Sequence, residues 1–315
     1  MLRDPLPWDR TLEIAETAEE TGYEALFVPE ISAREAFGTL ARLAAATGRL
    51  GLGTGVVTMG SRSPVTMAMA AATLQELSGG RAVLGLGAGQ PIGAARRGII
   101  DGVREYVGLV RDGAAGRPVI PSDTFGSPSF QLTMSPQPVP IWLGALGDRM
   151  VRLAGEVADG ALLNWCTPER VRRARDLVEE GAREAGRDPG EVTVAVYVRA
   201  CLGVSDDVAL AALREMTGLY ASLPWYFKQM EAMGLGDLAS AAAKALQEGR
   251  PADIPDELVR QLCVIGGRGD AVARFAEYRA AGADVVLCYP VAALDPFSSV
   301  LGTLMAAAPS PAVER

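Results

Sequence analysis

The sequence contains no histidine, and this absence excludes several kinds of active site. A Ser-His-Asp triad, a histidine general base and histidine metal ligands all require an imidazole. Cysteine is scarce as well, because the chain has only Cys166, Cys201, Cys263 and Cys288, which are far apart and form no CxxC pair. We therefore expect free, buried thiols in a reducing cytoplasm, without a metal site.

Lysine is scarce too, so the basic charge is nearly all arginine. Lys228 and Lys244 are the only lysines, and the formal net charge of the 315 residues is −8. This balance argues against a nucleic-acid partner. No apolar run reaches membrane-spanning length without a break or a charge, and the first ten residues lack the apolar core of a signal peptide. These absences predict a cytoplasmic protein with no nucleic-acid or membrane partner.

What the chain does have is apolar residues, 49% of the total, and two nearly identical glycine-rich hexapeptides. LGLGTG covers residues 50–55 and LGLGAG covers residues 84–89. Neither copy fits the GxGxxG pattern of dinucleotide-binding folds. We interpret them as two copies of a strand-plus-helix unit. Their glycines either thin the strands where side chains crowd or let a ligand approach the backbone.

Strands and helices alternate along most of the chain. Apolar runs typical of strands that are buried on both faces occur at 26–29, 50–56, 82–87, 140–145, 160–165, 192–202 and 284–289. Segments with helical spacing separate most of them. This α/β pattern predicts a (β/α)₈ TIM barrel with insertions, whose first strand is short or truncated at Met1–Asp4. We expect a single domain over residues 1–315, with insertion segments at about 113–138 and 204–262.

In such barrels the active site lies at the carboxyl ends of the strands. Reading those ends off the sequence gives the following rim: Glu30, 55–58, 87–90, 144–149, Asn164, Trp165, 199–201 and Tyr289. This rim is rich in glycine and poor in proton carriers. It suits a flat cofactor that performs the chemistry itself, held by the backbone of the protein.

Three segments carry a resemblance to a known family. They are 34–89, 138–160 and 269–284, which hold both hexapeptides, the sequence PIWLGALGDRM and the last predicted helix. Their order and spacing resemble the luciferase-like superfamily, within it the branch of coenzyme F420-dependent reductases related to methylenetetrahydromethanopterin reductase. The resemblance implies a TIM barrel, a bound deazaflavin or flavin, and a homodimer.

The resemblance also implies roles for residues at the first strand ends. Glu30 matches an acidic residue that touches the deazaflavin, but Ile31 stands where most relatives have a histidine. The bond between Gly55 and Val56 matches a non-prolyl cis peptide behind the central ring, and Thr58 would reach the polar edge of that ring. Ala88, Gly89 and Gln90 follow the next strand, where sugar-phosphate dehydrogenases of the family carry Gly-Glu.

Further along, the family binds the phosphate-bearing side chain of the cofactor at a helix start. The matching residues here are Leu146, Gly147, Arg149 and Met150, and free N–H groups at a helix start can hold an anion. Trp165 is expected to stack on the substrate or cofactor. Thr167 stands where the sugar-phosphate enzymes have a lysine, which argues against glucose 6-phosphate as the substrate.

Together these features predict an F420-dependent oxidoreductase that transfers hydride to or from a C=N or activated C=C bond of a small organic substrate. We expect Glu30, Gln90 and Trp165 at the reacting centre, with the proton coming from Glu30, from a tyrosine such as Tyr197, or from water. Two alternatives remain open. One is an FMN-dependent luciferase-like monooxygenase, and the other is a flavin-binding barrel without catalytic activity.

Overall fold

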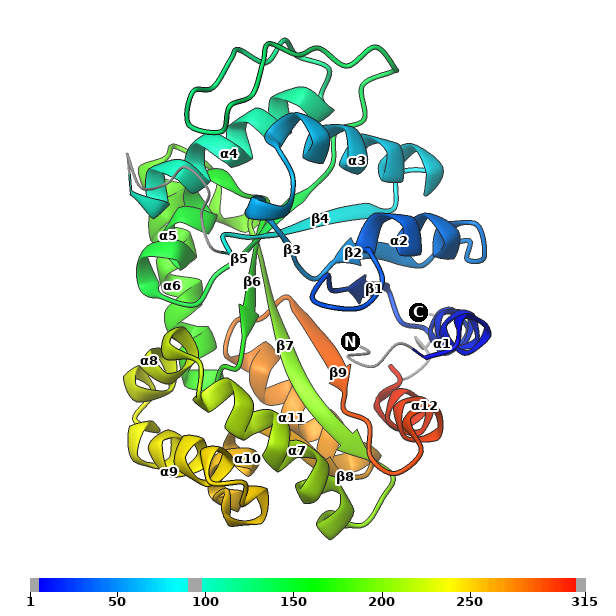
Figure 1. Ribbon diagram of the computed structural model, residues 1–315, viewed down its shortest axis with the longest axis vertical. Coiled ribbons are helices and arrows are strands. Elements are labelled where there is room, and N and C mark those ends of the chain that lie inside the picture. The colour runs from blue at the N-terminus through cyan, green and yellow to red at the C-terminus, as the bar shows by residue number, and fades with distance from the viewer. Residues whose placement is uncertain (1–5, 90–97, 310–315) are drawn as a thin grey trace. The chain divides into compact units, whose positions relative to one another are not determined.

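Strands and helices alternate along the computed structural model, which describes residues 6–89 and 98–309 (Figure 1). These residues form two compact units. The N-terminal unit takes in the described parts of Pro7–Leu162 together with Leu177–Thr193. The C-terminal unit takes in Leu163–Asp176 and the described chain from Val194 onward, together with Leu6. Each unit is considered by itself.

The N-terminal unit contains a parallel sheet with helices that follow its strands. Its strands are β1 (Ala25–Val28), β2 (Gly51–Thr54), β3 (Val57–Thr58), β4 (Ala82–Gly87), β5 (Ile141–Gly144) and the start of β6 (Gly160–Asn164). They pair in the order β1-β2-β4-β5-β6, and β3 also pairs with β4. Its helices are α1 (Trp8–Glu20), α2 (Ala36–Ala44), α3 (Pro64–Leu77), α4 (Ile99–Ala114), α5 (Asp148–Val157) and the end of α6 (Pro168–Glu184). Helices α2 to α5 pack against one another in sequence order.

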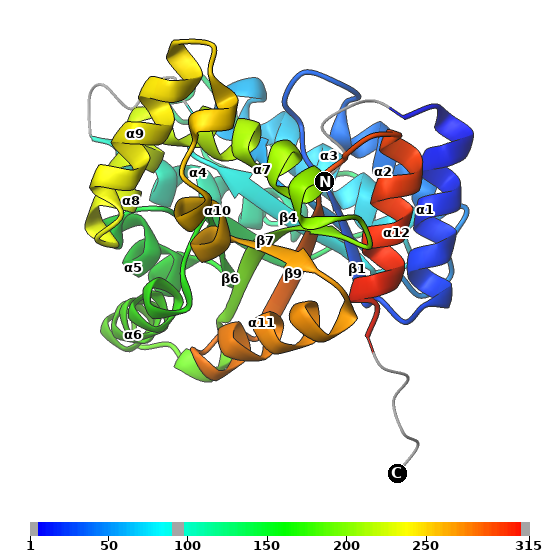
Figure 2. The same cartoon turned by 90° about the horizontal axis from the view of Figure 1, so that it is seen from below.

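The C-terminal unit combines strands with a cluster of helices. Most of β7 (Thr193–Leu202) belongs to it, and β7 pairs in parallel with both β8 (Cys263–Gly266) and β9 (Val285–Pro290). Its helices after α6 are α7 (Asp206–Ala221), α8 (Pro224–Ala232), α9 (Gly236–Gln247), α10 (Asp256–Leu262), α11 (Arg268–Ala280) and α12 (Pro296–Ala307). Helices α7, α9 and α10 pack together, and α8 lies against α7 and α9 (Figure 2).

The strand predictions are confirmed at all seven positions, with two differences in detail. The run predicted at 50–56 forms β2 only over Gly51–Thr54, because the chain turns at Gly55 and Val56, and the short strand β3 follows this turn. Strand β8 was not predicted, because its four residues directly follow a helix and carry no alternation signal. The first strand proposed at Met1–Asp4 lies outside the described residues, and the single-domain organisation stays a prediction.

The two predicted insertions differ in character. Residues 204–262 contain helices α7 to α10, as predicted. Residues 113–138 begin at the end of α4 and otherwise carry two isolated antiparallel bridges, Val119 with Phe130 and Ser122 with Ser127. That segment is rich in proline and glycine, which explains why none of its bridges extends into a strand.

The glycines of the two hexapeptides allow neighbouring strands to approach closely. A Cβ atom on Gly85 would lie 2.0 Å from the carbonyl oxygen of Thr54, and one on Gly53 would lie 2.3 Å from the ring of Phe27. Both distances are far below van der Waals contact. At these positions the interpretation that glycine thins the strands where side chains crowd is confirmed.

Glycine also sets the packing of α5 against α6 in the N-terminal unit. A Cβ on Gly155 would lie 2.1 Å from the carbonyl oxygen of Val178, and one on Gly181 would lie 2.1 Å from the carbonyl oxygen of Arg152. The two helices therefore touch backbone to backbone. Arg152 adds an ion pair with Glu180 beside this contact, with Nη2 2.8 Å from Oε2.

We predict that Gly155→Ala destabilises the protein by about 1–3 kcal/mol, because the added methyl group forces the two helices apart. The matched control is Gly108→Ala in α4, where a Cβ would meet nothing within 4 Å. There alanine should raise stability by about 0.5–1 kcal/mol through its helix propensity. Urea unfolding midpoints of both variants test this, and equal effects at the two positions would contradict it.

Candidate functional site

The predicted site residues of the N-terminal unit follow the carboxyl ends of its parallel strands. Glu30 follows β1, Val56 follows β2, Gly89 follows β4 and Gly147 follows β5. The strands pair so that Val28 lies opposite Thr54, and Gly87 opposite Gly144. The strand ends therefore meet at one edge of the sheet and bring these residues together. Gln90 lies outside the described residues.

The peptide bond between Gly55 and Val56 is cis, as the family resemblance implied. The backbone on both sides of this bond is tied to the end of β1. The N–H of Gly55 donates to the carbonyl oxygen of Val28 at 2.8 Å, and the N–H of Glu30 donates to that of Val56 at 3.3 Å. Glu30 and the cis peptide are thus held in one hydrogen-bonded turn.

Gly87 makes room for the side chain of Val56. A Cβ built on Gly87 would lie 2.7 Å from a methyl carbon of Val56, whereas Cβ atoms on Gly85 and Gly144 would lie at ordinary contact distances of 3.5 and 3.4 Å. Gly89 follows the same pattern beside Thr58, because a Cβ there would lie 3.0 Å from the Cβ of Thr58. Gly89 also has a φ of +57°, a backbone conformation that favours glycine.

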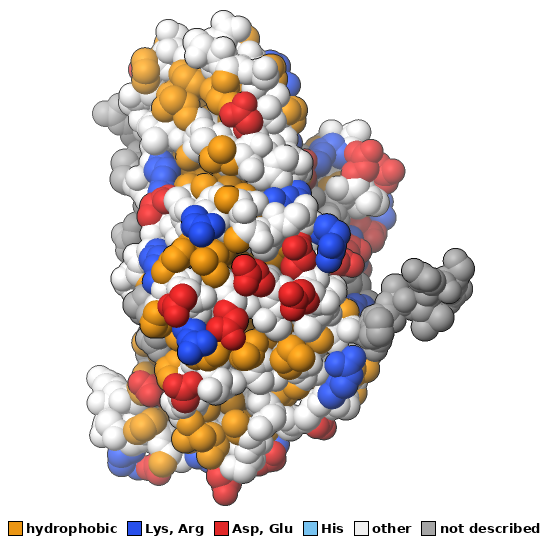
Figure 3. All heavy atoms as spheres, turned by 90° about the vertical axis from the view of Figure 1, so that its right-hand side faces the viewer, with side chains coloured by type: hydrophobic (Ala, Val, Ile, Leu, Met, Phe, Trp, Pro, Cys, Tyr) orange, Lys and Arg blue, Asp and Glu red, His pale blue; other side chains and the backbone are white. Residues whose placement is uncertain are grey.

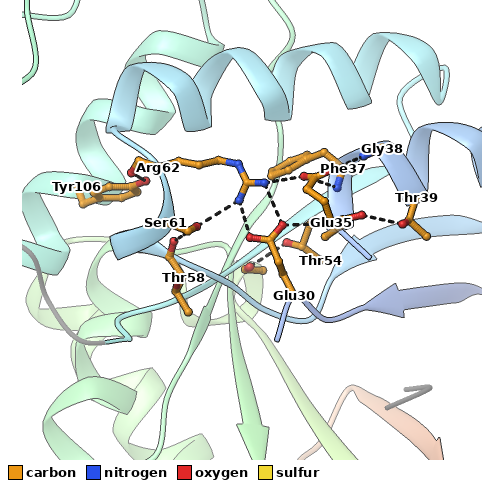
Figure 4. A network of polar contacts seen from close by, with 12 residues as sticks. Glu30, Glu35, Phe37, Gly38, Thr39, Thr54, Thr58, Ser61, Arg62 and Tyr106 are labelled. Carbon is orange, nitrogen blue, oxygen red and sulfur yellow. Dashed lines mark hydrogen bonds and ion pairs between the residues drawn. The ribbon is translucent and has the colours of Figure 1, made fainter. Parts of the chain in front are cut away.

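Glu30 forms a two-pronged ion pair with Arg62 (Figure 4). Nη1 of Arg62 lies 2.7 Å from Oε1 of Glu30, and Nη2 lies 2.9 Å from Oε2. The N–H of Ala36 donates to Oε2 at 3.1 Å. About four fifths of both side chains are buried, since 15% of Arg62 and 20% of Glu30 are exposed. The predicted acidic residue is therefore a fixed carboxylate rather than a mobile one.

Arg62 is itself held from several directions. Nη2 also pairs with Oε1 of Glu35 at 2.6 Å, and Glu35 caps α2 by accepting from the N–H of Phe37 and Gly38. The guanidinium lies 5.0 Å from the ring centroid of Phe37. Tyr106 Oη donates to the carbonyl oxygen of Arg62 at 2.9 Å. The arginine thus links the edge of the sheet to α2 and α4.

This arrangement sets the protonation state of Glu30. The hydrogen bonds from Arg62, with a smaller contribution from the N–H of Ala36, hold the pKa of the Glu30 carboxyl below its usual 4.5, although partial burial opposes them. The pKa of Arg62 is raised in return. At neutral pH, Glu30 is a carboxylate that accepts hydrogen bonds and has no proton to give.

The start of α5 is open where an anion was predicted to bind. Gly147 is its N-cap, has no side chain to cap the helix, and would place a Cβ more than 4 Å from any neighbour. Leu146, Arg149 and Met150 surround this turn in the sequence. Helix starts carry partial positive charge and unsatisfied N–H groups, so this turn has the chemistry of an anion site.

In the C-terminal unit, Trp165 follows β6 and is 1% exposed. Its ring centroid lies 4.8 Å from that of Tyr220 and 4.4 Å from the guanidinium carbon of Arg199. Gln229 Nε2 donates to the carbonyl oxygens of Asn164 and Trp165, each at 2.8 Å. Trp165 is thus fixed within a cluster of aromatic and polar side chains. Its predicted contact with a substrate or cofactor stays a prediction.

The sequence reading missed Arg62 entirely and gave Arg199 no role. Arg62 lies 32 residues from Glu30 in the sequence, and only the fold brings the two together. Arg199 left a clearer signal, because it is a charged residue inside the apolar ten-residue run TVAVYVRACL.

All four cysteines are free, and Cys166, Cys201 and Cys263 are buried. Burial raises the pKa of Cys166 to about 11, which keeps this thiol protonated.

In residues 6–89 and 98–309, no cluster of three or more acidic or cysteine side chains could hold a metal ion. No helix of the same ranges is long and apolar enough to span a membrane. The face in Figure 3 shows acidic and basic side chains interspersed with small apolar patches.

Comparisons with known proteins identify relatives along nearly the whole chain. A family model described as luciferase-like monooxygenase matches residues 1–285. A 5,10-methylenetetrahydromethanopterin reductase of Methanolobus tindarius is 35% identical over 216 residues, which is 65% of this chain and 66% of that protein. The chain therefore matches about two thirds of the length of that relative.

Two further matches are longer. The 5,10-methylenetetrahydromethanopterin reductase of Archaeoglobus fulgidus is 29% identical over 287 residues, which is 86% of each chain. The solved structure of the coenzyme F420-dependent tetrahydromethanopterin reductase of Methanopyrus kandleri superposes with a TM-score of 0.81 at 23% identity. That superposition covers 96% of this chain and 95% of the other, so the predicted α/β barrel fold is confirmed.

We predict that Glu30→Gln lowers the free energy of unfolding by about 1–2 kcal/mol at pH 7, because it breaks a largely buried charge-assisted pair. The folded pKa of Glu30 lies below 4.5, so the pair stabilises the protein fully above that pH. Its contribution disappears as the pH falls through the folded pKa, so the difference between wild type and variant should shrink as the pH falls from neutral to below 4.5.

Urea midpoints across this pH range provide the measurement. The control is Glu13→Gln, which removes an exposed pair with Arg10 whose side chains are 47% and 46% exposed. That change should cost less than about 0.5 kcal/mol at any pH. A Glu30→Gln effect that does not vary with pH would contradict the proposed ion pair.

Proposed function

Because the chain belongs to the luciferase-like monooxygenase family, we propose that it is a coenzyme F420-dependent oxidoreductase. Its substrate is a small organic molecule, and hydride passes to or from a C=N or activated C=C bond. The observation that carries the proposal is the edge of the sheet in the N-terminal unit. There the cis peptide at Gly55–Val56, backed by glycines, lies beside the carboxylate of Glu30. The coenzyme F420-dependent reductase whose structure superposes with a TM-score of 0.81 supports the choice of cofactor.

The residues of this edge fit a flat, polar-rimmed ring. Gly55, Val56 and Thr58 present a backbone turn and a hydroxyl, and Gly87 and Gly89 leave room for the side chains of Val56 and Thr58. We propose that these residues and Glu30 hold the ring, together with Ala88 and Gln90. Leu146, Gly147, Arg149 and Met150 would hold the phosphate of the cofactor tail at the open start of α5.

Bound F420 would supply the hydride, which leaves binding, orientation and proton handling to the protein. Glu30 is suited to orient the ring as a hydrogen-bond acceptor, because Arg62 keeps it ionised. For the same reason Glu30 is a poor proton donor at neutral pH. The proton then falls to water, because burial raises the pKa of Tyr197 and makes that tyrosine a weaker acid.

We further propose a cytoplasmic homodimer. The four free cysteines suit a reducing compartment. The dimer is what the family resemblance implies, and sedimentation at several protein concentrations tests it.

The cofactor is tested by titrating the purified protein with F420, FMN and NADP separately, followed by absorbance and fluorescence. We predict that F420 binds more tightly than FMN and that NADP does not bind. Tighter binding of FMN would favour the monooxygenase alternative. Binding of F420 without turnover of any imine or activated alkene would favour the barrel without catalytic activity.

We predict that Gly147→Leu weakens F420 binding by about tenfold or more, because the new side chain covers the N–H groups at the start of α5. The fold should be retained, since a Cβ at Gly147 meets nothing within 4 Å. Gly267→Leu is the matched control, because Gly267 is the equally open glycine N-cap of α11 in the C-terminal unit. It should leave F420 affinity unchanged. Equal F420 affinity in both variants and wild type would remove α5 from the proposed site.

A further inference from the structure

Within the described part of the chain, Arg199 is a buried cation without an anionic partner. Arg199 is 1% exposed and lies within β7. Its Nη1 donates to Oδ1 of Asn164, and its guanidinium carbon lies 4.4 Å from the ring centroids of both Trp165 and Tyr289. No Asp or Glu of residues 6–89 and 98–309 forms an ion pair with it. Its Nε has no hydrogen-bond partner there.

The surroundings compensate this charge only in part. Ring faces attract a buried guanidinium and an amide oxygen carries a partial negative charge, but the desolvation of a cation costs more than such contacts return. Removing a charge from water without a counter-ion is therefore expensive. A neutral side chain of similar length would fill the same volume at lower cost, so packing alone gives no reason for an arginine at this position.

A second set of observations concerns the polar groups around Arg199. The indole Nε1 of Trp165 and Oε1 of Gln229 are also buried and have no hydrogen-bond partner among the described residues. Trp165 adopts a φ of +54°, a conformation that non-glycine residues rarely take. It is held there by Gln229, which binds the two carbonyl oxygens at the end of β6. Two N–H donors without acceptors, on Arg199 and Trp165, thus lie in one cluster.

Asn164 and Tyr226 are partly exposed members of this cluster. Asn164 is the last residue of β6 and is half-buried, while its neighbours Trp165 and Arg199 are fully buried. Its Oδ1 accepts from Arg199, and its Nδ2 donates to Tyr226 Oη at 2.8 Å. The neutral amide oxygen of Asn164 thus lies at the edge of the guanidinium. An anionic oxygen at the same position would bind the guanidinium more strongly.

We propose that Arg199 and Asn164 form a binding site for the carboxylate of a small, flat organic acid. One guanidinium balances one negative charge, and its planar edge matches the two oxygens of a carboxylate. The rings of Trp165, Tyr220 and Tyr226 supply an apolar wall for the flat body of such a ligand. That the ligand is the substrate of the oxidoreductase rests on the proposed function, whereas carboxylate binding itself does not.

The test uses benzoate as the probe and needs no cofactor. Isothermal titration and thermal melts of the wild-type protein should show benzoate binding at least tenfold tighter than the neutral benzamide. They should also show it tighter than inorganic phosphate. Equal binding of benzoate and benzamide, tighter binding of phosphate, or no binding of benzoate would each overturn the proposal.

Asn164→Asp is the most informative variant, because it places a carboxylate against Arg199 within the protein. The melting temperature should rise, and benzoate affinity should fall at least tenfold. Arg199→Met should likewise abolish benzoate binding. If that variant does not fold, Arg199→Lys keeps the charge but loses the planar edge, and it should weaken benzoate binding at least threefold. Unchanged benzoate affinity in Asn164→Asp would overturn the proposal.

Arg260→Met is the control, since Arg260 is an exposed arginine of the same unit that pairs with Asp206. It should bind benzoate as the wild type does, and an equal loss of benzoate binding in this variant would also overturn the proposal. Failure of the wild-type protein to bind F420 would defeat the proposed function and leave the benzoate result intact. The two proposals therefore fail separately.

Discussion

The close approach of β4 to the end of β2 is the constraint from which the candidate site follows. At Gly85 a side-chain carbon would lie 2.0 Å from the carbonyl oxygen of Thr54, so only glycine allows this spacing. The Thr54 hydroxyl then donates to the carbonyl oxygen of Gly85 at 2.8 Å and locks the two strands together. The chain leaves Thr54 directly into the cis peptide, and Glu30 is hydrogen-bonded to that turn. The backbone geometry of the site is thus a consequence of strand packing.

The electrostatics of the same site follow from Arg62. With no histidine in the chain, the remaining candidates for proton transfer are carboxylates, tyrosines and water. Arg62 removes Glu30 from this group by keeping it ionised, because a carboxylate with a lowered pKa is a weaker base and a fully deprotonated acid. A site of this kind orients a reactive cofactor and leaves the hydride chemistry to it, which agrees with the proposed F420-dependent function.

Much of the fold could be predicted from the sequence, and the limits of that prediction are physical. Continuous apolar runs predicted the strands because parallel strands buried on both faces need apolar side chains throughout. Strand β8 was not predicted, because four residues after a helix carry no periodic signal. The cis bond between Gly55 and Val56 was predicted from the family resemblance alone. The spacing of Arg62 and Glu30 in the sequence could not predict their ion pair. The two residues are 32 positions apart, and the contact depends on where the chain runs after β3.

The net charge of the chain does not reveal which buried side chains keep an uncompensated charge. The net charge of −8 suggests a protein with an excess of carboxylates. In the N-terminal unit, however, the carboxylate of Glu30 is neutralised by a two-pronged arginine. In the C-terminal unit, the buried charge is the cation of Arg199, whose partners are a neutral amide and ring faces. Average charge therefore says little about binding chemistry here, because water and salt screen exposed carboxylates, whereas a buried guanidinium is screened much less and still attracts an anion.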